Sequence, residues 1–139
     1  EAGWHEALER LPAEVVGGAF HFALHTQRPG RRYAEWAVTL RGRLLKLPFG
    51  DQSIFCRRDA YGKSGGFPHE PLFEDVAFFV RLRRLGPTAF LPIRAVSSAR
   101  RWERDGPIFT TARNNFLLLL YLAGVPPSRL WEMYGPGPR

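Results

Sequence analysis

The spacing of the hydrophobic residues changes several times along this chain, and this alternation limits the folds that are open to it. In residues 14–24, Phe20, Phe22 and Leu24 recur at every second position, which is typical of a strand. In residues 33–47, apolar residues recur at the three- and four-residue spacing of a helix. Alternating strand and helix patterns predict an α/β fold with a mixed sheet flanked by helices.

The same reasoning predicts the remaining elements. The predicted helix 33–47 has one apolar face, formed by Tyr33, Trp36, Ala37, Leu40, Leu44 and Leu47. The charged residues lie away from this face; they are Arg32, Glu35, Arg43 and Lys46. In the first half of the chain, the other predicted elements are a helix at 3–10, a turn at 27–30, and a short strand followed by a small helix over 53–61. In the second half, they are a helix at 74–85, one or two strands over 88–99 broken at Pro92, a helix from Pro107 to about Ala123, a last short helix, and a loose tail at 135–139. Asp105 and Ser128 are the predicted caps of the last two helices.

The length and composition suit a single domain or part of one, over residues 1–139. The chain is 45% hydrophobic and 14% aromatic, which is enough for a packed core. Cys56 is the only cysteine, so no internal disulfide can form, and a reducing, cytoplasmic location is expected. The longest apolar run, 116–123, is far shorter than the ~20 residues that cross a bilayer. The first residues read like the middle of a domain, so we expect further residues upstream.

The charge balance favours an anionic partner. Twenty Lys and Arg against 13 Asp and Glu give a net charge of +7, which suits a nucleotide, a nucleic acid or an acidic membrane surface. Lys46 and Lys63 are the only lysines. Arginine suits forked recognition of phosphate, but a GC-rich genome would explain the same bias equally well.

Two adjacent acids, Glu74 and Asp75, open the predicted helix at 74–85, behind a loop that contains Gly65 and Gly66. Unpaired N–H groups and the helix dipole favour carboxylates in a first turn, so the pair could be purely structural. The same position would keep a catalytic base ionised and oriented. The two glycines could form a plain turn or let the backbone approach a ligand closely.

Residues 50–86, "GDQSIFCRRDAYGKSGGFPHEPLFEDVAFFVRLRRLG", followed by "SSARRWERDG" at 97–106, resemble the C-terminal half of a family 2 glycosyltransferase with the GT-A fold. They are most similar to the group known as radical-SAM/selenodomain-associated transferases. The resemblance covers residues 4–134. It implies that the chain is the acceptor-side half of a Rossmann-like nucleotide-diphospho-sugar transferase, which moves a sugar to a hydroxyl group with inversion.

The resemblance also implies roles for particular residues. Asp75 matches the catalytic base of the family, and Glu74 would orient the site or contact the acceptor. The donor-sugar pocket would involve Asp51 and Gln52, which follow Gly50. A further set would contact the diphosphate or the acceptor; it comprises Arg100, Arg101 and Trp102. Arginine can form forked bonds to phosphate, and an indole can stack on a sugar, although a surface turn with a half-buried tryptophan is the alternative.

The resemblance also implies a donor, an acceptor and a divalent metal as partners. The donor would be a nucleotide-sugar, and the unknown acceptor could be lipid-linked. A divalent metal, Mn²⁺ or Mg²⁺, is expected in the complete enzyme, yet its Asp-x-Asp motif is absent from the sequence. In the family that motif would precede residue 1 with the nucleotide-binding half, so we expect this half upstream or on a partner subunit.

Three other residues could in principle carry chemistry, but their positions favour a structural role. His21 and His25 would lie about 13 Å apart on a strand, too far for a metal pair. Cys56 lies in an apolar strand, which favours a core residue over a nucleophile. A basic nucleic-acid-binding or assembly module is the alternative function, but the arginines are scattered and no nucleic-acid motif occurs, so no nucleic acid is expected. The apolar helix 108–123 could pack in the core, against the missing half or a partner subunit, or on the cytoplasmic face of a membrane.

Overall fold

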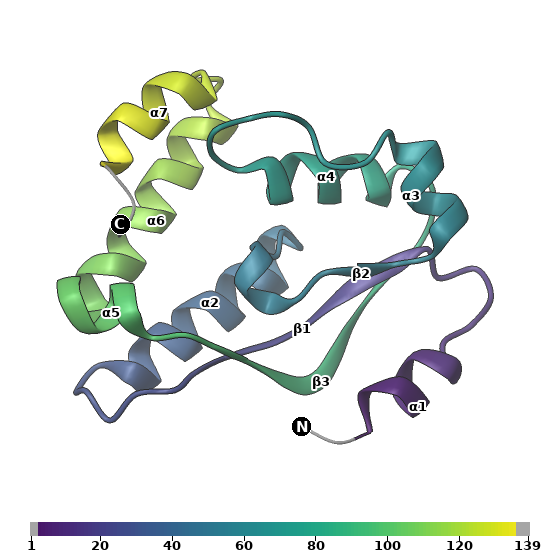
Figure 1. The fold of residues 1–139 in the computed structure, drawn as a ribbon, viewed down its shortest axis with the longest axis horizontal. Coiled ribbons are helices and arrows are strands. Elements are labelled where there is room, and N and C mark those ends of the chain that lie inside the picture. The colour runs from purple at the N-terminus through teal and green to yellow at the C-terminus, as the bar shows by residue number, and fades with distance from the viewer. Residues whose placement is uncertain (1–2, 136–139) are drawn as a thin grey trace.

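The computed structural model describes residues 3–135, apart from the side chain of Arg101. Its centre is a small mixed sheet of three strands with helices packed around it (Figure 1). The central strand β1 (Gly17–Leu24) is antiparallel to β2 (Phe55–Cys56) and parallel to β3 (Thr88–Ser97). The predicted α/β class, with a mixed sheet flanked by helices, is confirmed for this part of the chain.

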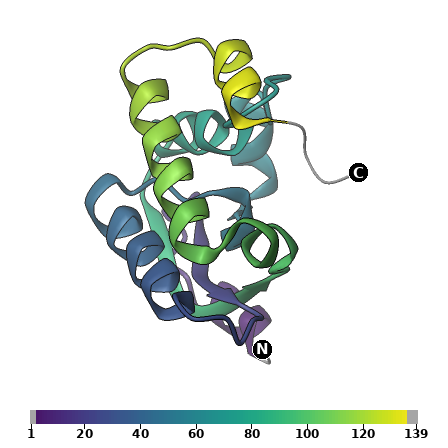
Figure 2. The ribbon, with the colours of Figure 1, turned by 90° about the vertical axis from the view of Figure 1, so that its left-hand side faces the viewer.

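The helices follow the predicted order, with two additions, a 3₁₀ turn and a short helix. They are α1 (Trp4–Glu9), α2 (Arg31–Leu45), the 3₁₀ turn η1 (Gly50–Gln52), α3 (Arg58–Ser64), α4 (Glu74–Arg83), α5 (Arg100–Asp105), α6 (Pro107–Leu122) and α7 (Pro127–Tyr134). The additional helix is α5, which has only six residues and therefore shows little hydrophobic periodicity. Figure 2 shows α2 and α6 side by side on one face of the molecule.

The pair Gly17–Gly18 allows the three strands to approach one another closely. A Cβ atom at Gly18 would lie 1.8 Å from the carbonyl oxygen of Ala89 on β3. A Cβ atom at Gly17 would lie 2.5 Å from the carbonyl oxygen of Phe55 on β2. Any larger residue at either position would separate strands that glycine lets meet.

Strand β3 is continuous, so the predicted break at Pro92 is wrong. The pairing of β1 with β3 shifts at this point, because Phe20 pairs with Leu91 whereas the next residue, His21, pairs with Arg94. The irregularity leaves Pro92 without a partner on β1, and β3 is at the edge of the described sheet. A proline is tolerated in such a place because its missing N–H leaves no ladder bond broken.

Helix α2 packs on the sheet with its small residues, not with the face of large apolar residues that the hydrophobic spacing predicted. Its small residues Ala34 and Val38 pack with Phe22 and Leu24 of β1. The larger apolar residues of the predicted face point mostly to solvent; those exposed are Tyr33, Trp36, Leu40 and Leu44. Only Ala37 and Leu47 of that face are buried.

The main core lies where α4, α6 and α7 meet. Phe73 and Val76 from the start of α4 pack with Leu117 and Leu118 of α6 and with Leu130 of α7. A second cluster under the other end of α4 contains Phe78, Phe79 and Leu82, together with Ala60 of α3. Among residues 3–135, no helix combines the length and apolar character needed to cross a membrane.

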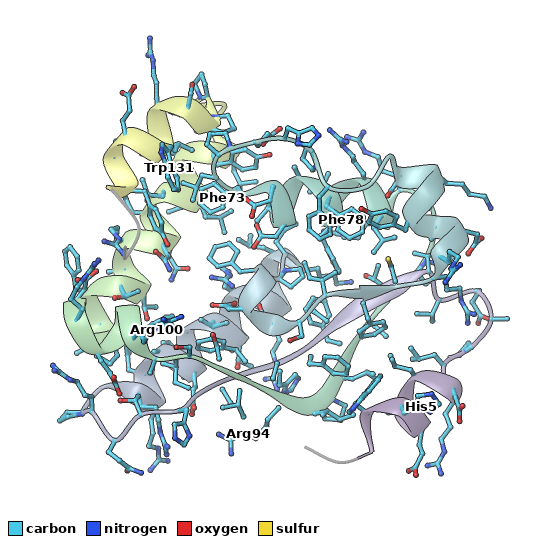
Figure 3. The ribbon with its side chains drawn as sticks, in the orientation of Figure 1. His5, Phe73, Phe78, Arg94, Arg100 and Trp131 are labelled. Carbon is cyan, nitrogen blue, oxygen red and sulfur yellow. The ribbon has the colours of Figure 1, made fainter. Side chains whose placement is uncertain are left out.

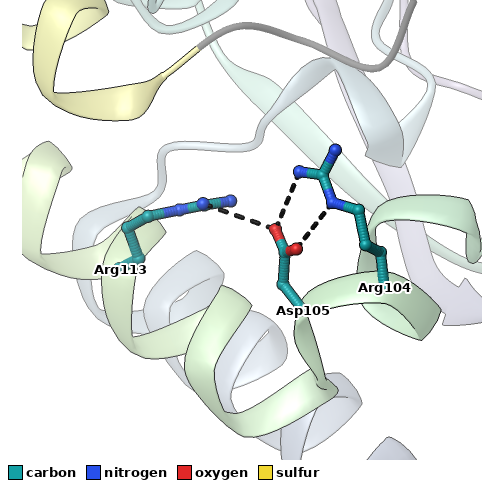
Figure 4. A network of polar contacts seen from close by, with 3 residues as sticks. All are labelled: Arg104, Asp105 and Arg113. Carbon is teal, nitrogen blue, oxygen red and sulfur yellow. Dashed lines mark hydrogen bonds and ion pairs between the residues drawn. The ribbon is translucent and has the colours of Figure 1, made fainter.

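Two predicted helix caps are wrong. Gly106, not Asp105, precedes α6, and the side chain of Asp105 accepts bonds from Arg104 and Arg113 instead (Figure 4). Two arginines attract this carboxylate more strongly than the neutral N–H groups of a helix end. Ser128 lies inside α7, which begins at Pro127 because proline suits a first helical position. Of the predicted tail at 135–139, residues 136–139 lie outside the described residues.

Candidate functional site

The carboxylate of Asp75 links the first turn of α4 to η1. One of its oxygens, Oδ2, accepts the backbone N–H of Gly50, and the other, Oδ1, accepts the N–H of Val76 at 2.7 Å. Burial raises the pKa of Asp75, while these two N–H groups act in the opposite direction and the neighbouring Glu74 adds to the rise. The result is an oriented aspartate that is more basic than one in water.

Asp51 and Arg41 lie within electrostatic range of Asp75. Burial raises the pKa of Asp51 to about 6, with Arg41 opposing the rise and Asp75 adding to it. Burial also lowers the pKa of Arg41 to about 10, against the attraction of both aspartates. Arg41 therefore stays protonated at neutral pH and supplies a positive charge to a pair of interacting carboxyl groups.

Arg41 is held by contacts on several sides. Its Nη2 donates to Oε1 of Gln52 at 3.3 Å, and its Nη1 donates to Oδ1 of Asn115 at 3.4 Å. The guanidinium carbon lies 3.6 Å from the centroid of the Phe49 ring, a cation–π contact. These contacts fix the cation behind η1, at the inner side of the acidic pair.

A hollow of about 310 Å³ opens beside the acids, with walls from the η1 turn and from α4, α6 and α7. Its volume is at the lower end of the roughly 300–1,000 Å³ typical of small-molecule sites. Phe73, before α4, and Trp131 of α7 both line it, and Figure 3 shows them on the same side of the molecule. The polar and aromatic lining residues include Asp51, Glu74, Asp75, Asn114, Trp131 and Tyr134.

Two of these lining residues have buried oxygens without a hydrogen-bond donor among the described residues. They are Oδ1 of Asp51 and Oδ1 of Asn114. Buried polar atoms in folded proteins are normally paired, and exceptions call for a specific explanation. Both oxygens are shielded from solvent in this conformation, so a ligand with hydroxyl groups would reach them only if the two side chains moved.

Gln52, a predicted donor-pocket residue, is occupied by contacts within the protein. Besides accepting from Arg41, its Oε1 accepts the N–H of Phe49 at 3.3 Å, and its Nε2 donates to the carbonyl of Phe20 at 3.3 Å. These bonds tie η1 to α2 and to the central strand. The structure thus places Gln52 as a support for the turn that carries Asp51.

The two loop glycines, Gly65 and Gly66, lie at the end of α3, and neither lines the acidic hollow. A side chain added at Gly65 would come within 3.9 Å of Arg81. Arg81 is six residues beyond Asp75 on α4, or about 9 Å along the helix axis. The structure does not bring the glycine loop together with Asp75.

The predicted arginine–tryptophan corner is in α5 and also lies apart from the hollow. Trp102 is only 6% exposed and packs against Phe22, with ring centroids 5.5 Å apart. Arg100 donates from Nε to Oγ of Ser98 at 3.3 Å and lies apart from Trp131 (Figure 3). The side chain of Arg101 is outside the described part of the chain.

No metal site emerges from the part of the chain that the structure describes. Nowhere in residues 3–135 do three or more His, Cys, Asp or Glu side chains gather closely enough to hold a metal ion. The acidic pair Asp51 and Asp75 has Arg41 beside it as a permanent cation. These residues do not fit the expected divalent metal.

Several residues in or next to the hollow were not predicted from the sequence. The adjacent amides Asn114 and Asn115 directly precede an apolar run in α6, and this polar pair was the available signal. Arg41 falls at a helical position that the predicted apolar face did not include. Trp131 and Tyr134 carry no signal of their own, because only the packing of α7 against α6 brings them to the acids.

A larger hollow, of about 540 Å³, lies on the other side of η1 and has the opposite charge. Arg43, Lys46 and Arg83 line it, and no acidic residue does. Arg83 also donates to the carbonyls of Leu45 and Lys46, where α2 ends. Its lining includes His21, whose imidazole can act as a general base, but no carboxylate held by backbone N–H groups as Asp75 is, so the acidic hollow is the stronger candidate for chemistry.

Comparison of the chain with protein-family models, with curated proteins and with solved structures found no match.

Proposed function

We propose that this chain forms the acceptor side of a glycosyltransferase that uses a nucleotide-sugar, with Asp75 as the catalytic base. The observation that supports the proposal is the Asp75 carboxylate, held by two backbone N–H groups at the edge of a hollow that also contains Asp51. The three-stranded sheet and its helices would then be part of a GT-A fold. The resemblance of residues 50–86 and 97–106 to family 2 glycosyltransferases supports the same reading.

In the proposed reaction, a hydroxyl group of the acceptor donates a hydrogen bond to Asp75. As the hydroxyl oxygen attacks the anomeric carbon, its proton passes to the carboxylate, and the bond to the nucleotide diphosphate breaks on the opposite face. The configuration at the anomeric carbon is therefore inverted. Burial makes Asp75 a stronger base, and the N–H groups and Arg41 favour its ionised form before the transfer.

The other groups of the hollow would position the acceptor. A movement of the Asp51 and Asn114 side chains would present their unpaired oxygens, now shielded from solvent, to further hydroxyl groups of a polyhydroxylated acceptor. The exposed ring of Trp131 offers an apolar face of the kind on which sugars stack. No donor-binding residue is assigned within these 139 residues.

The test is a transfer assay on the full-length protein with a panel of UDP-, GDP- and dTDP-sugars, with Mn²⁺ or Mg²⁺ added. Replacement of the base, Asp75→Asn, should lower turnover by about 10²–10⁴-fold and leave nucleotide binding nearly unchanged. The matched control is Asp59→Asn, because Asp59 is an exposed aspartate on α3 that pairs with Lys63. Turnover of Asp75→Asn at the level of the control would show that Asp75 is not the base.

A further inference from the structure

Helices α2 and α6 run side by side in the same direction (Figure 2). At their beginnings, a Cβ atom at Gly30 would lie 3.2 Å from the side chain of Ile108. Near their middles, Arg41 donates to Asn115 across the interface. A shallow groove of about 320 Å³ lies between the two helices further along.

The outer surface of these two helices is apolar and exposed. Leu44 is 73% exposed, Leu119 61% and Trp36 59%. Further exposed residues of the same two helices are Tyr33, Leu40, Ile108, Phe109, Phe116 and Leu122. Folded proteins rarely expose so many large apolar side chains together unless the surface binds something.

The exposed charged residues of α2 and α6 are all basic. The only acid of α2, Glu35, is turned toward the sheet, where it accepts the N–H of Leu24 and pairs with Arg94. Helix α6 has no acidic residue. Arg32 and Arg43 are exposed and, at 100° per residue, fall beside Trp36 on the edge of the apolar stripe. An apolar face with an arginine edge and no exposed acid is complementary to an anionic, partly apolar partner.

We propose that the α2–α6 face binds the surface of a lipid bilayer that contains anionic phospholipids. The apolar side chains would enter the boundary between headgroups and acyl chains, with Trp36 and Tyr33 at the interface that such rings prefer. Arg32 and Arg43 would contact the lipid phosphates. A second copy of the chain fits this face less well, because its α2–α6 face has no exposed acid to pair with Arg32 and Arg43. The inference rests on this surface alone and is independent of the proposed function.

Co-sedimentation with vesicles tests the proposal on the full-length protein. Binding is expected to vesicles of phosphatidylcholine and phosphatidylglycerol in equal parts, with much weaker binding to phosphatidylcholine alone and a decrease as salt is added. The double replacement Leu44→Gln with Leu119→Gln should weaken binding at least about tenfold, because both side chains lose their apolar contact. Arg32→Gln with Arg43→Gln should weaken it by about 25-fold, at about fivefold for each arginine.

Matched controls lie on the opposite side of the fold. Trp4→Gln with Leu85→Gln removes two exposed apolar residues from α1 and from the end of α4, and Arg58→Gln with Arg84→Gln removes two exposed arginines. Both controls should bind like the wild type, and thermal melting should show that every variant is folded. If the variant Leu44→Gln with Leu119→Gln does not fold, vesicle binding by the variant Arg32→Gln with Arg43→Gln still tests the proposal.

Three results would overturn the proposal. The first is an absence of binding to anionic vesicles at low salt. The second is equal binding by the α2–α6 variants and their controls. The third is a dimer, detected by light scattering, that the Leu44→Gln and Leu119→Gln replacements dissociate, since a second copy would then occupy the face.

Discussion

The carboxylate of Asp75 accepts the backbone N–H of Gly50, so that the first turn of α4 is tied to a turn 25 residues earlier in the chain. This bond positions the acidic side chain of the next residue, Asp51, beside Asp75 in one hollow. The same carboxylate thus has a structural role and a proposed chemical one. The two roles can be separated by experiment, because stability and turnover respond to different replacements.

Replacement of Asp75 by alanine is expected to destabilise the protein. The N–H groups of Gly50 and Val76 would lose their acceptor, and the free energy of unfolding should fall by about 1–3 kcal/mol. The same replacement at exposed Asp59 should leave the free energy of unfolding nearly unchanged. Urea denaturation measures both, and equal effects at the two positions would contradict the geometry described for Asp75.

Stability should decrease as the pH rises from about 4 to about 6. The pKa of Asp51 is raised to about 6 in the folded state, so the folded protein holds this proton more tightly than the unfolded chain. The stabilisation is complete below the unfolded pKa and is lost as the pH rises through the folded one. The titration of Asp51 alone would lower the free energy of unfolding by up to about 3 kcal/mol over this range. The pKa of Asp75 is raised as well, so its titration acts in the same direction.

Denaturation of Asp51→Asn at a series of pH values checks this dependence. The variant should show a flatter profile between pH 4 and 6, because the titrating group is gone. At Asp59, hydrogen bonding to Lys63 lowers the pKa, so Asp59→Asn should not flatten the profile. An unchanged profile in Asp51→Asn would assign the pH dependence to other groups.

Loss of the buried cation should be more harmful than loss of its exposed neighbour. Arg41→Leu removes the bonds to Gln52 and Asn115 and the contact with Phe49, and should lower the free energy of unfolding by about 2–4 kcal/mol. It should also raise the pKa of Asp51 further, because Arg41 opposes that rise. Arg43→Leu, two residues away and exposed, is the control, with an expected change of about 0.5 kcal/mol. Guanidinium denaturation compares the two variants.

The two tryptophans near the C-terminal helices should behave in opposite ways. Trp102→Ala empties a packed site next to Phe22 and should cost about 3–5 kcal/mol of stability. Trp131→Ala removes a ring that is 42% exposed and should cost about 1 kcal/mol or less. If the proposed function holds, Trp131→Ala should instead raise the KM for the acceptor. Calorimetry and steady-state kinetics on both variants separate the two effects.

The close approach of the strands can be tested at a single glycine. Gly18→Ala would place a methyl group against the carbonyl of Ala89 and should destabilise the protein by more than about 2 kcal/mol. Gly62→Ala is the control, since a Cβ atom there meets nothing within 4 Å and the residue lies in α3. That change should be stabilising, by up to about 1 kcal/mol. Thermal denaturation distinguishes these opposite signs.

Local signals in the sequence were sufficient for most of the elements. The alternation of Phe20, Phe22 and Leu24 predicted β1, and the acid pair before an apolar run predicted the start of α4 at Glu74. These signals depend on residues within one or two turns, so they survive without knowledge of the neighbours. The errors fall where a distant group changes the outcome, as when Arg113 engages Asp105 or when the register of β1 shifts opposite Pro92.

The sequence alone thus specified an α/β chain with a strand at β1 and an acidic first turn at Glu74 and Asp75, because periodicity and helix-end chemistry are local properties. Contacts across the fold specified the rest. They joined Asp75 to Gly50, placed Trp102 in the core and Trp131 beside the acids, and buried the small face of α2 while leaving Trp36 and Leu44 exposed. Which apolar face of a helix is buried depends on the shape of the surface that it meets, and small residues allow α2 to approach the sheet most closely.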